Sequence, residues 1–182
     1  MQEHYFDLLR QAVSHERMET YCCNEDDEDL DLFARYVWNI QLSEALYPVL
    51  QNVEVVLRNS VHTAAAKAFN NTLWLDCNPN ILNEKEQSCV EKAKKELRKR
   101  GKQIEPGRLV AELNFGFWTS LFDVRYEQVL WPKLLKTAFP YMPRRSRTRK
   151  TLSKQLNQVR HLRNRVFHHE PIWYLDNLLQ QH

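Results

Sequence analysis

Apolar side chains recur at helical spacing over a long stretch in the first half of the chain. The apolar positions from Leu42 to Ala68 are separated by steps of 4, 4, 3, 4, 4, 3 and 4 residues, and such steps place side chains on one face of an α-helix. The stretch predicts a helix over residues 42–69, in which Pro48 marks either a kink or the true start. Only 3 glycines occur in the chain, whereas tight hairpin turns use glycine to reach positive φ. Both features favour an all-α fold.

Shorter helices are expected on both sides of this stretch. Helical patterns cover residues 5–14, 28–39, 84–100, 106–113, 126–139 and 146–167, and a short piece follows at 173–179. We expect Gly101 and Pro171 to end two of these helices, residues 70–83 to form a loop, and the aromatic block NFGFWTSL at 114–121 to be buried. A length of 182 residues suits one domain. We therefore predict a single-domain helical bundle over residues 1–182, with an N-terminal helix and an acidic segment within residues 1–30.

Cysteine usage and hydropathy indicate the cellular setting of the protein. The 4 cysteines show no metal-ligand spacing, and no secretory signal precedes them, which favours a reduced, cytoplasmic setting. No apolar run approaches the roughly 18 residues needed to span a membrane. We expect no membrane partner and no cofactor.

Charge is distributed unevenly along the chain. Between Glu127 and Glu170 there are 11 Lys and Arg and no Asp or Glu, so 15 basic residues remain against 23 acidic ones elsewhere. A basic segment on an acidic body suggests an anionic partner on one face; the alternative is a solvated helix whose charges bind nothing specific. The residues expected to contact RNA are Arg144, Arg145, Arg147, Arg149, Lys150 and Arg160.

The end of the last predicted helix carries the residues that indicate chemistry. Arg163 falls near the middle of the apolar stripe of that helix, where a charge is costly unless it faces a partner, a ligand or a wet cleft. Its guanidinium suits phosphate oxygens, and Asn164 adds an amide beside it. The alternative is a structural arginine paired with a buried carboxylate such as Glu54.

Two adjacent imidazoles, His168 and His169, follow, and either could move a proton near neutral pH. In a regular helix His168 lies about 140° around from Arg163. The two groups can share a phosphate only if the helix loosens before Pro171 or if they meet across a symmetric dimer. His169 lies about 120° away in the other direction, so geometry does not choose between the imidazoles. A metal site from His168, His169 and Glu170 is disfavoured, because consecutive side chains splay apart.

A second polar stripe lies on the long predicted helix. Glu54, Arg58 and His62 are spaced i, i+4 and i+8, which stacks them on one face. They are read either as a shell that supports the catalytic residues or as an intrahelical ion pair plus a surface histidine. Asn59 is adjacent but points elsewhere.

At these residues the sequence resembles a known family. The stretch RNRVFHH fits the Arg-x4–6-His motif of the HEPN superfamily (higher eukaryotes and prokaryotes nucleotide-binding), with asparagine in the favoured position after the arginine. Three blocks in order resemble the Abi-like (abortive infection) family within it. They are LSEALYPVLQNVEVVLRNSVH at 42–62, ELNFGFWTSLF at 112–122 and VRHLRNRVFHHEPIW at 159–173.

The resemblance implies a helical bundle of HEPN type that forms a homodimer, with two motifs at one composite cleft. It also implies a metal-independent endoribonuclease that acts as a toxin or antiphage effector. On that basis Arg163 and His168 are expected to be catalytic and Asn164 to assist, with Glu54, Arg58, Asn59, His62 and His169 in support. RNA is the expected partner, and a toxin needs a restraint, either an antitoxin protein or an RNA. The rival hypotheses are a non-catalytic RNA-binding or scaffold module, and a protein-interaction module that docks through NFGFWTSL.

Overall fold

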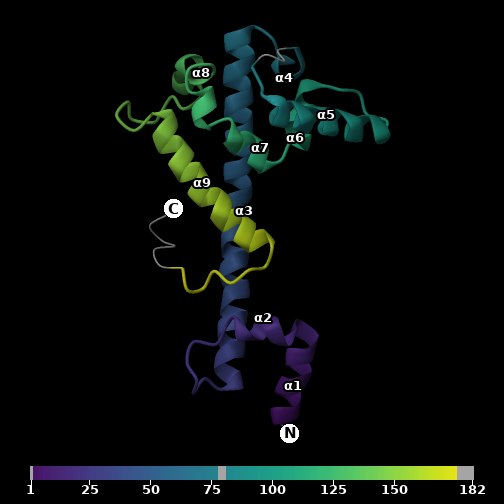
Figure 1. The fold of residues 1–182 in the computed structure, drawn as a ribbon, viewed down its shortest axis with the longest axis vertical. Helices are drawn as coiled ribbons and strands as arrows, with labels where there is room; N and C mark the ends of the chain where they lie inside the picture. Colours follow the sequence, from purple (N-terminus) through teal and green to yellow (C-terminus); the bar gives the residue numbers. More distant parts are fainter. Residues whose placement is uncertain (1, 78–80, 176–182) are drawn as a thin grey trace. The chain divides into compact units, whose positions relative to one another are not determined.

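The computed structural model describes residues 2–77 and 81–175, which form helices and no β-strand in these ranges (Figure 1). The all-α prediction is confirmed. The elements are α1 (Gln2–Val13), α2 (His15–Glu19), α3 (Asp29–Phe69), α4 (Trp74–Cys77), α5 (Glu84–Lys99), α6 (Pro106–Glu112), α7 (Phe115–Ser120), the 3-10 helix η1 (Val124–Tyr126), α8 (Trp131–Ala138) and α9 (Arg149–Phe167). Every helix in the described ranges is too short or too polar to cross a bilayer.

The described residues fall into two compact units. The first holds the residues up to 50 together with those from 161 onward, and the second holds residues 51–160. Helices α3 and α9 each contribute to both units. The single domain predicted over residues 1–182 stays a prediction.

Helix α3 corrects the prediction of two separate helices over residues 28–39 and 42–69. It runs without a break from Asp29 to Phe69, with Pro48 inside it. Ile40 and Gln41, at the expected gap, have no helix-breaking character. Pro48 removes only one N–H, and the Glu44 carbonyl that loses its partner belongs to an exposed residue. A single missing bond does not end a helix whose apolar face is buried on both sides of it.

The first unit has a small aromatic core. Met18, Tyr21 and Leu32 are buried, and partly buried apolar side chains that include Trp173 pack against them. The segment before α3 is fixed by an ion pair, because Arg35 donates to both oxygens of Asp27 at 2.6 and 2.9 Å. This pairing and two backbone N–H bonds hold the pKa of the Asp27 carboxyl well below its usual range.

The second unit contains the larger core. Its largest side chains are the fully buried Trp74, Trp118, Trp131, Phe122 and Tyr126. The buried face of α3 contributes Leu57, Val61, Ala64 and Ala65, which agrees with the predicted apolar stripe except at Ala68, which is exposed.

The NFGFWTSL block forms α7 and lies in this core. Phe115, Phe117 and Trp118 are buried, with at most 4% of each exposed. The prediction of burial is confirmed, and no aromatic surface remains there for docking another protein. The hypothesis of a protein-interaction module that uses this block is therefore wrong.

Two of the differences from the predicted helix boundaries have a local cause. The segment 70–83, expected to be a loop, contains the short helix α4, because the indole of Trp74 is fully buried and holds that turn in the core; residues 78–80 lie outside the described ranges. Helix α9 begins at Arg149 rather than near 146, because the Thr148 hydroxyl accepts a hydrogen bond from Thr151 N–H at 3.1 Å and caps the helix. Of the short piece expected at 173–179, residues 176–179 also lie outside the described ranges.

Candidate functional site at the end of helix α9

The last two turns of α9 position the motif residues. Arg163 is half-buried, as its place in the apolar stripe predicts, while Leu162 and Val166 beside it are buried. Its guanidinium carbon lies 4.2 Å from the centre of the Phe167 ring, one turn further along the helix. Phe167 in turn stacks on Tyr47 of α3, with ring centres 4.5 Å apart and planes at 13°. A cation over an aromatic face is held in place without losing its charge.

Helix α9 ends in a Schellman motif. His169 N–H donates to Val166 O at 3.2 Å, and Glu170 N–H donates to Arg165 O at 2.8 Å, which is the pair of bonds that closes this helix end. The motif requires a left-handed residue, and His169 occupies that position with φ 58°. Pro171 follows two residues later and prevents the helix from continuing, as predicted.

Two other helices end in the same way with different residues. Helix α5 places Gly101 at the left-handed position, with φ 65°, and α3 places Asn70 there, with φ 50°. The matching bonds are present at both ends, from Lys102 N–H to Leu97 O and from Asn71 N–H to Ala66 O. Glycine and asparagine are the residues that this position favours. An imidazole at the end of α9 is therefore costly to the backbone, and backbone strain of this kind concentrates at functional sites.

The two adjacent histidines differ in environment. His168 N–H still donates to Asn164 O at 2.9 Å, so His168 stays on the helical path, and its side chain is exposed, as is that of Asn164. Because the backbone of His169 is left-handed, its side chain leaves the helical path and lines a pocket. Within the described residues, no group of three His, Cys, Asp or Glu side chains is placed to hold a metal ion.

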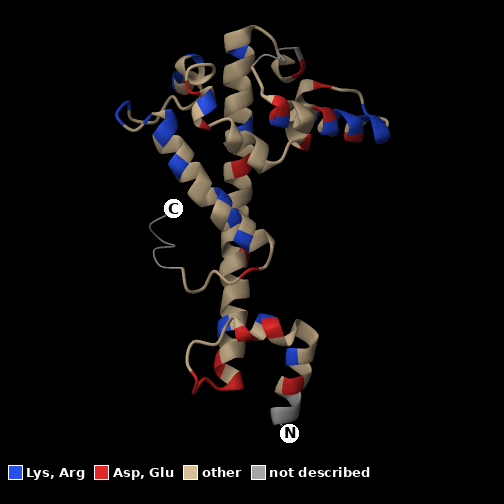
Figure 2. Ribbon diagram, viewed as in Figure 1, with Lys and Arg blue, Asp and Glu red and all other residues tan. Residues whose placement is uncertain are grey.

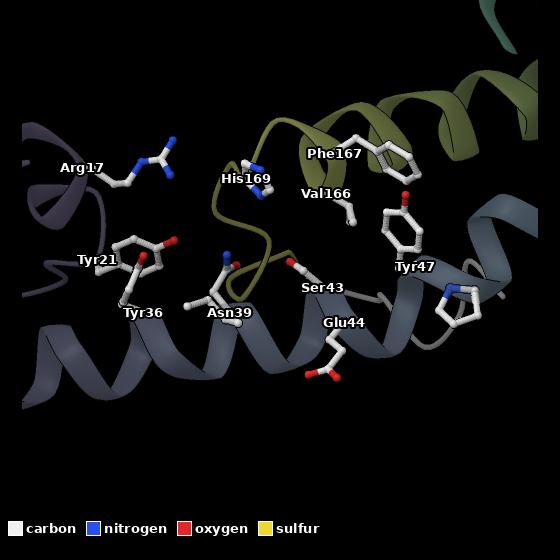
Figure 3. A pocket seen from close by; sticks show the side chains of 12 residues that line it. Arg17, Tyr21, Tyr36, Asn39, Ser43, Glu44, Tyr47, Val166, Phe167 and His169 are labelled. Carbon is white, nitrogen blue, oxygen red and sulfur yellow. The ribbon is translucent and has the colours of Figure 1, made fainter. Parts of the chain in front are cut away.

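The pocket belongs to the first unit and has a volume of about 940 Å³ (Figure 3). Side chains from α2, the turn after it, α3 and the end of α9 line it. They are Arg17, Tyr21, Tyr36, Asn39, Ile40, Ser43, Glu44, Tyr47, Pro48, Val166, Phe167 and His169. Four of them are aromatic rings, so the walls are suited to a planar ligand.

Asn39 anchors the chain beneath this pocket. It is only 3% exposed, and its Oδ1 accepts hydrogen bonds from Ile172 N–H at 2.7 Å and Trp173 N–H at 3.2 Å. The amide thus ties the segment after Pro171 to the first third of α3. Sequence reasoning missed Asn39, although one signal was available: it continues the apolar stripe of α3 three residues before Leu42, where a polar side chain must find partners.

The four expected supporting residues on α3 lie in the second unit. Glu54 and Arg58 are half-buried and Asn59 is exposed. His62 is half-buried, and its Nδ1 accepts a hydrogen bond from Trp74 Nε1 at 3.1 Å. Burial lowers the pKa of this imidazole. His62 therefore helps to hold the buried Trp74, a structural role that its spacing did not indicate.

The basic segment, whose Lys and Arg positions are blue along α8 and α9 in Figure 2, contains both structural and exposed cations. Arg147 donates to Phe139 O at 3.2 Å, and Arg149 donates to Phe122 O at 3.1 Å and Glu127 Oε2 at 3.4 Å. Arg160 donates to Thr119 Oγ1 at 3.5 Å. In contrast, Arg144, Arg145 and Lys150 are exposed. Half of the cations expected to contact RNA thus already bind groups of the second unit.

Comparison with known proteins gives a family. The family model described as Abi-like protein matches residues 2–174, nearly the whole chain. The protein belongs to the Abi-like family. No curated protein and no solved structure matches it. The matched range includes both units and the end of α9, and membership of the Abi-like family supports a role in abortive infection.

Proposed function

We propose that this Abi-like protein is a metal-independent endoribonuclease that acts in abortive infection. The observation that carries the proposal is the end of α9, where a guanidinium braced on an aromatic ring precedes two imidazoles by five and six residues. Family membership supports it, and the spacing fits the Arg-x4–6-His motif of the HEPN superfamily.

The chemistry needs no group beyond these side chains and the RNA. The ribose 2′-hydroxyl attacks the adjacent phosphorus, so that a bond from phosphorus to O2′ forms and the bond to the leaving 5′-oxygen breaks. His168 takes the 2′-hydroxyl proton or gives a proton to the 5′-oxygen. Arg163 stabilises the charge that builds on the phosphoryl oxygens, and Asn164 assists with a hydrogen bond. The products are a 2′,3′-cyclic phosphate and a free 5′-hydroxyl.

The intact helix end favours a dimer as the active form. Because His168 stays on the helical path, it remains about 140° around α9 from Arg163. One regular helix therefore does not direct both groups at one phosphate, but two copies of α9 facing each other would supply an arginine from one protomer and an imidazole from its partner. The dimer also provides two imidazoles, one for the base and one for the acid.

The dimer must use the face of α3 that holds the end of α9. Ile40 and Tyr47 are on that face and are 47% and 48% exposed. Trp38 is also apolar and is 57% exposed, but it lies about 160° around the helix from Ile40. Pairing through the Trp38 face would keep the two motifs apart, so the composite cleft requires the Ile40 face.

The RNA backbone is expected to follow the cations that the fold leaves exposed. These are Arg144, Arg145 and Lys150, which can approach phosphates without giving up a hydrogen bond. Arg147, Arg149 and Arg160 support the same segment from within. A toxin of this kind also needs a restraint in its own cell, for which an antitoxin protein or RNA is proposed.

The direct test is cleavage of labelled RNA by the purified protein, with and without EDTA. Arg163→Ala and His168→Ala are each expected to lower the cleavage rate by about 10²-fold or more. Arg98→Ala on α5 and His161→Ala on α9 are the matched controls, because both side chains are exposed and lie outside the motif; they should cleave like the wild type. DNA of the same sequence lacks the 2′-hydroxyl and should survive.

Three results would contradict the proposal. EDTA could abolish cleavage, Arg163→Ala could leave it intact, or the product could carry a 5′-phosphate instead of a 5′-hydroxyl. Salt-sensitive RNA binding with no turnover, unaffected by His168→Ala, would favour the non-catalytic RNA-binding or scaffold module instead.

A further inference from the structure

The pocket beside His169 has a floor of polar groups whose orientation is fixed. Asn39 Oδ1 already accepts two backbone N–H bonds, so the amide cannot flip without losing both. Its Nδ2 must therefore be the end that faces the pocket, and Figure 3 shows this nitrogen turned toward the space beneath His169. No hydrogen bond of this nitrogen occurs within the described residues. The floor thus presents a hydrogen-bond donor to a ligand in the pocket.

Two hydroxyl groups complete the floor. Tyr21 is 1% exposed, and its hydroxyl points toward Asn39 in Figure 3; within the described residues it has no hydrogen-bond partner. Of the two, the Ser43 hydroxyl, one turn after Asn39, is the one whose oxygen is buried without a partner among the residues described. Burial raises the pKa of Tyr21, so its phenol stays protonated. Both hydroxyl groups can therefore accept as well as donate a hydrogen bond.

The walls and the mouth suit a nucleotide better than a purely apolar ligand. Tyr36 and the face of Tyr47 that is turned away from Phe167 supply flat surfaces, and stacking on aromatic side chains is how proteins bind single-stranded bases. Arg17 and His169 line the pocket from the side opposite the α3 floor (Figure 3), where they can meet a phosphate. An apolar ligand would leave Asn39 and both hydroxyl groups without partners, which costs about 1–3 kcal/mol for each group.

We propose that this pocket is a base-specific subsite that takes one single-stranded nucleobase of the RNA and prefers bases with a keto group, uracil and guanine. The inference rests on the proposed ribonuclease function, because it assigns the sequence preference of that enzyme. The Asn39 amide donates to the ring carbonyl, O4 of uracil or O6 of guanine. The neighbouring ring N–H donates to the hydroxyl of Ser43 or Tyr21.

Cytosine and adenine fit this floor poorly. Each carries an amino group where uracil and guanine carry the carbonyl, so a donor would face the fixed donor of Asn39. One good base contact of this kind is worth about 1–3 kcal/mol. The expected preference for keto bases over amino bases is therefore roughly tenfold or more.

Asn39→Asp tests the assignment with the least change in shape. The aspartate keeps Oδ1 for Ile172 and Trp173 but replaces the pocket-facing donor by an acceptor. Calorimetric titration with UMP, GMP, CMP and AMP is expected to show tighter binding of UMP and GMP in the wild type and of CMP and AMP in the variant. Gln103→Glu, at an exposed position in the second unit, adds the same charge and should keep the wild-type order.

Two further variants test the pocket even if Asn39→Asp fails to fold. Tyr21→Phe and Ser43→Ala each remove one hydroxyl and keep the surrounding shape, and they should weaken UMP binding by roughly 2- to 10-fold. Equal binding of all four nucleotides by the wild type would overturn the proposal. So would an unchanged order in folded Asn39→Asp together with unchanged UMP affinity in the two hydroxyl variants.

The binding and cleavage measurements separate this inference from the proposed function. The four nucleotides contain no phosphodiester to cut, so their binding does not depend on catalysis. Mapping of cleavage sites on RNA should show cuts beside uridine or guanosine in the wild type and beside cytidine or adenosine in Asn39→Asp. Binding of UMP with no effect of Asn39→Asp on the cleavage sites would overturn the RNA subsite in favour of a free nucleotide. Binding of UMP by a protein that cuts no RNA would count against the ribonuclease alone.

Discussion

Replacing His169 by glycine should stabilise the fold while it removes an imidazole from the pocket. The left-handed backbone at His169 and the two hydrogen bonds of its Schellman motif provide the reason. The backbone there is already suited to glycine, as the matching position Gly101 at the end of α5 shows.

The size of the effect follows from two opposing contributions. A left-handed conformation costs a residue with a Cβ about 1–2 kcal/mol, which glycine avoids. Glycine also makes the unfolded chain more flexible, at a cost of about 0.5–1 kcal/mol. The net gain is about 0.5–1 kcal/mol, which raises the melting temperature by about 1–4 °C for a chain of this length.

Two variants make the comparison sharp. His169→Ala removes the same imidazole but keeps the strained Cβ, so it should be no more stable than the wild type. His168→Gly places glycine one residue earlier, where φ is not positive, and should lose about 0.5–1 kcal/mol. In urea unfolding, the free energy of unfolding should be highest for His169→Gly. The wild type should follow, with His169→Ala no higher than the wild type and His168→Gly below it.

The same variants test the pocket. His169→Gly and His169→Ala should weaken UMP binding equally, because both lack the imidazole and only the backbone distinguishes them. If His169→Gly were less stable than the wild type, the argument from strain would be wrong. If it bound UMP as tightly as the wild type, the imidazole would have no part in the pocket.

Three further predictions concern the rest of the molecule. Lys150→Ala should weaken RNA binding and reduce the slope of log binding constant against log salt concentration by about 0.7, with stability unchanged. The neighbouring Arg149→Ala should instead lose about 1–3 kcal/mol of unfolding free energy, because the Phe122 carbonyl and Glu127 lose their donor. Burial lowers the pKa of His62 below its ordinary value of 6.5, so its contribution to stability is present above pH 6.5 and is lost as the pH falls through the lowered pKa. His62→Asn keeps an acceptor for Trp74 and should flatten the decline in unfolding free energy between pH 7 and 5. Ile40→Glu should convert a dimer to monomers in sedimentation and abolish cleavage, while Trp38→Glu should do neither; the opposite result would place the dimer on the other face of α3.

Much of the fold could be predicted from the sequence, because helical periodicity records which face is buried. The stripe between Leu42 and Val61 faces inward, Gly101 ends α5, and the NFGFWTSL block lies in the core, as expected. These predictions depend on neighbours within a few turns of one helix. The break expected near residue 40 was wrong because short gaps in the apolar pattern resemble helix ends although the backbone continues through them.

The candidate site was predictable only in part, because its partners come from distant positions. Arg163 could be identified by its place in an apolar stripe, but Asn39 meets Ile172 and Trp173 from 133 and 134 positions away. Charge counting had a similar weakness. It could not separate Arg149, which binds a carbonyl and a carboxylate, from the exposed Lys150 beside it.

The polar groups around the pocket differ in their hydrogen bonding from a buried carboxylate of the second unit, and this difference supports the proposed subsite. In the second unit Glu86 accepts hydrogen bonds from Ser120 and Tyr126 at 2.8 and 2.9 Å, so its charge is satisfied within the core. In the first unit an amide donor, two hydroxyl groups and a strained imidazole share one cavity. Buried side-chain nitrogens without a partner among the described residues also occur in the second unit, at Arg58, Trp118 and Arg149. What distinguishes the first unit is that several polar groups line one cavity. A fold selected for stability alone would fill such a cavity with apolar side chains, and a ligand with complementary polar edges is the physical reason to keep it.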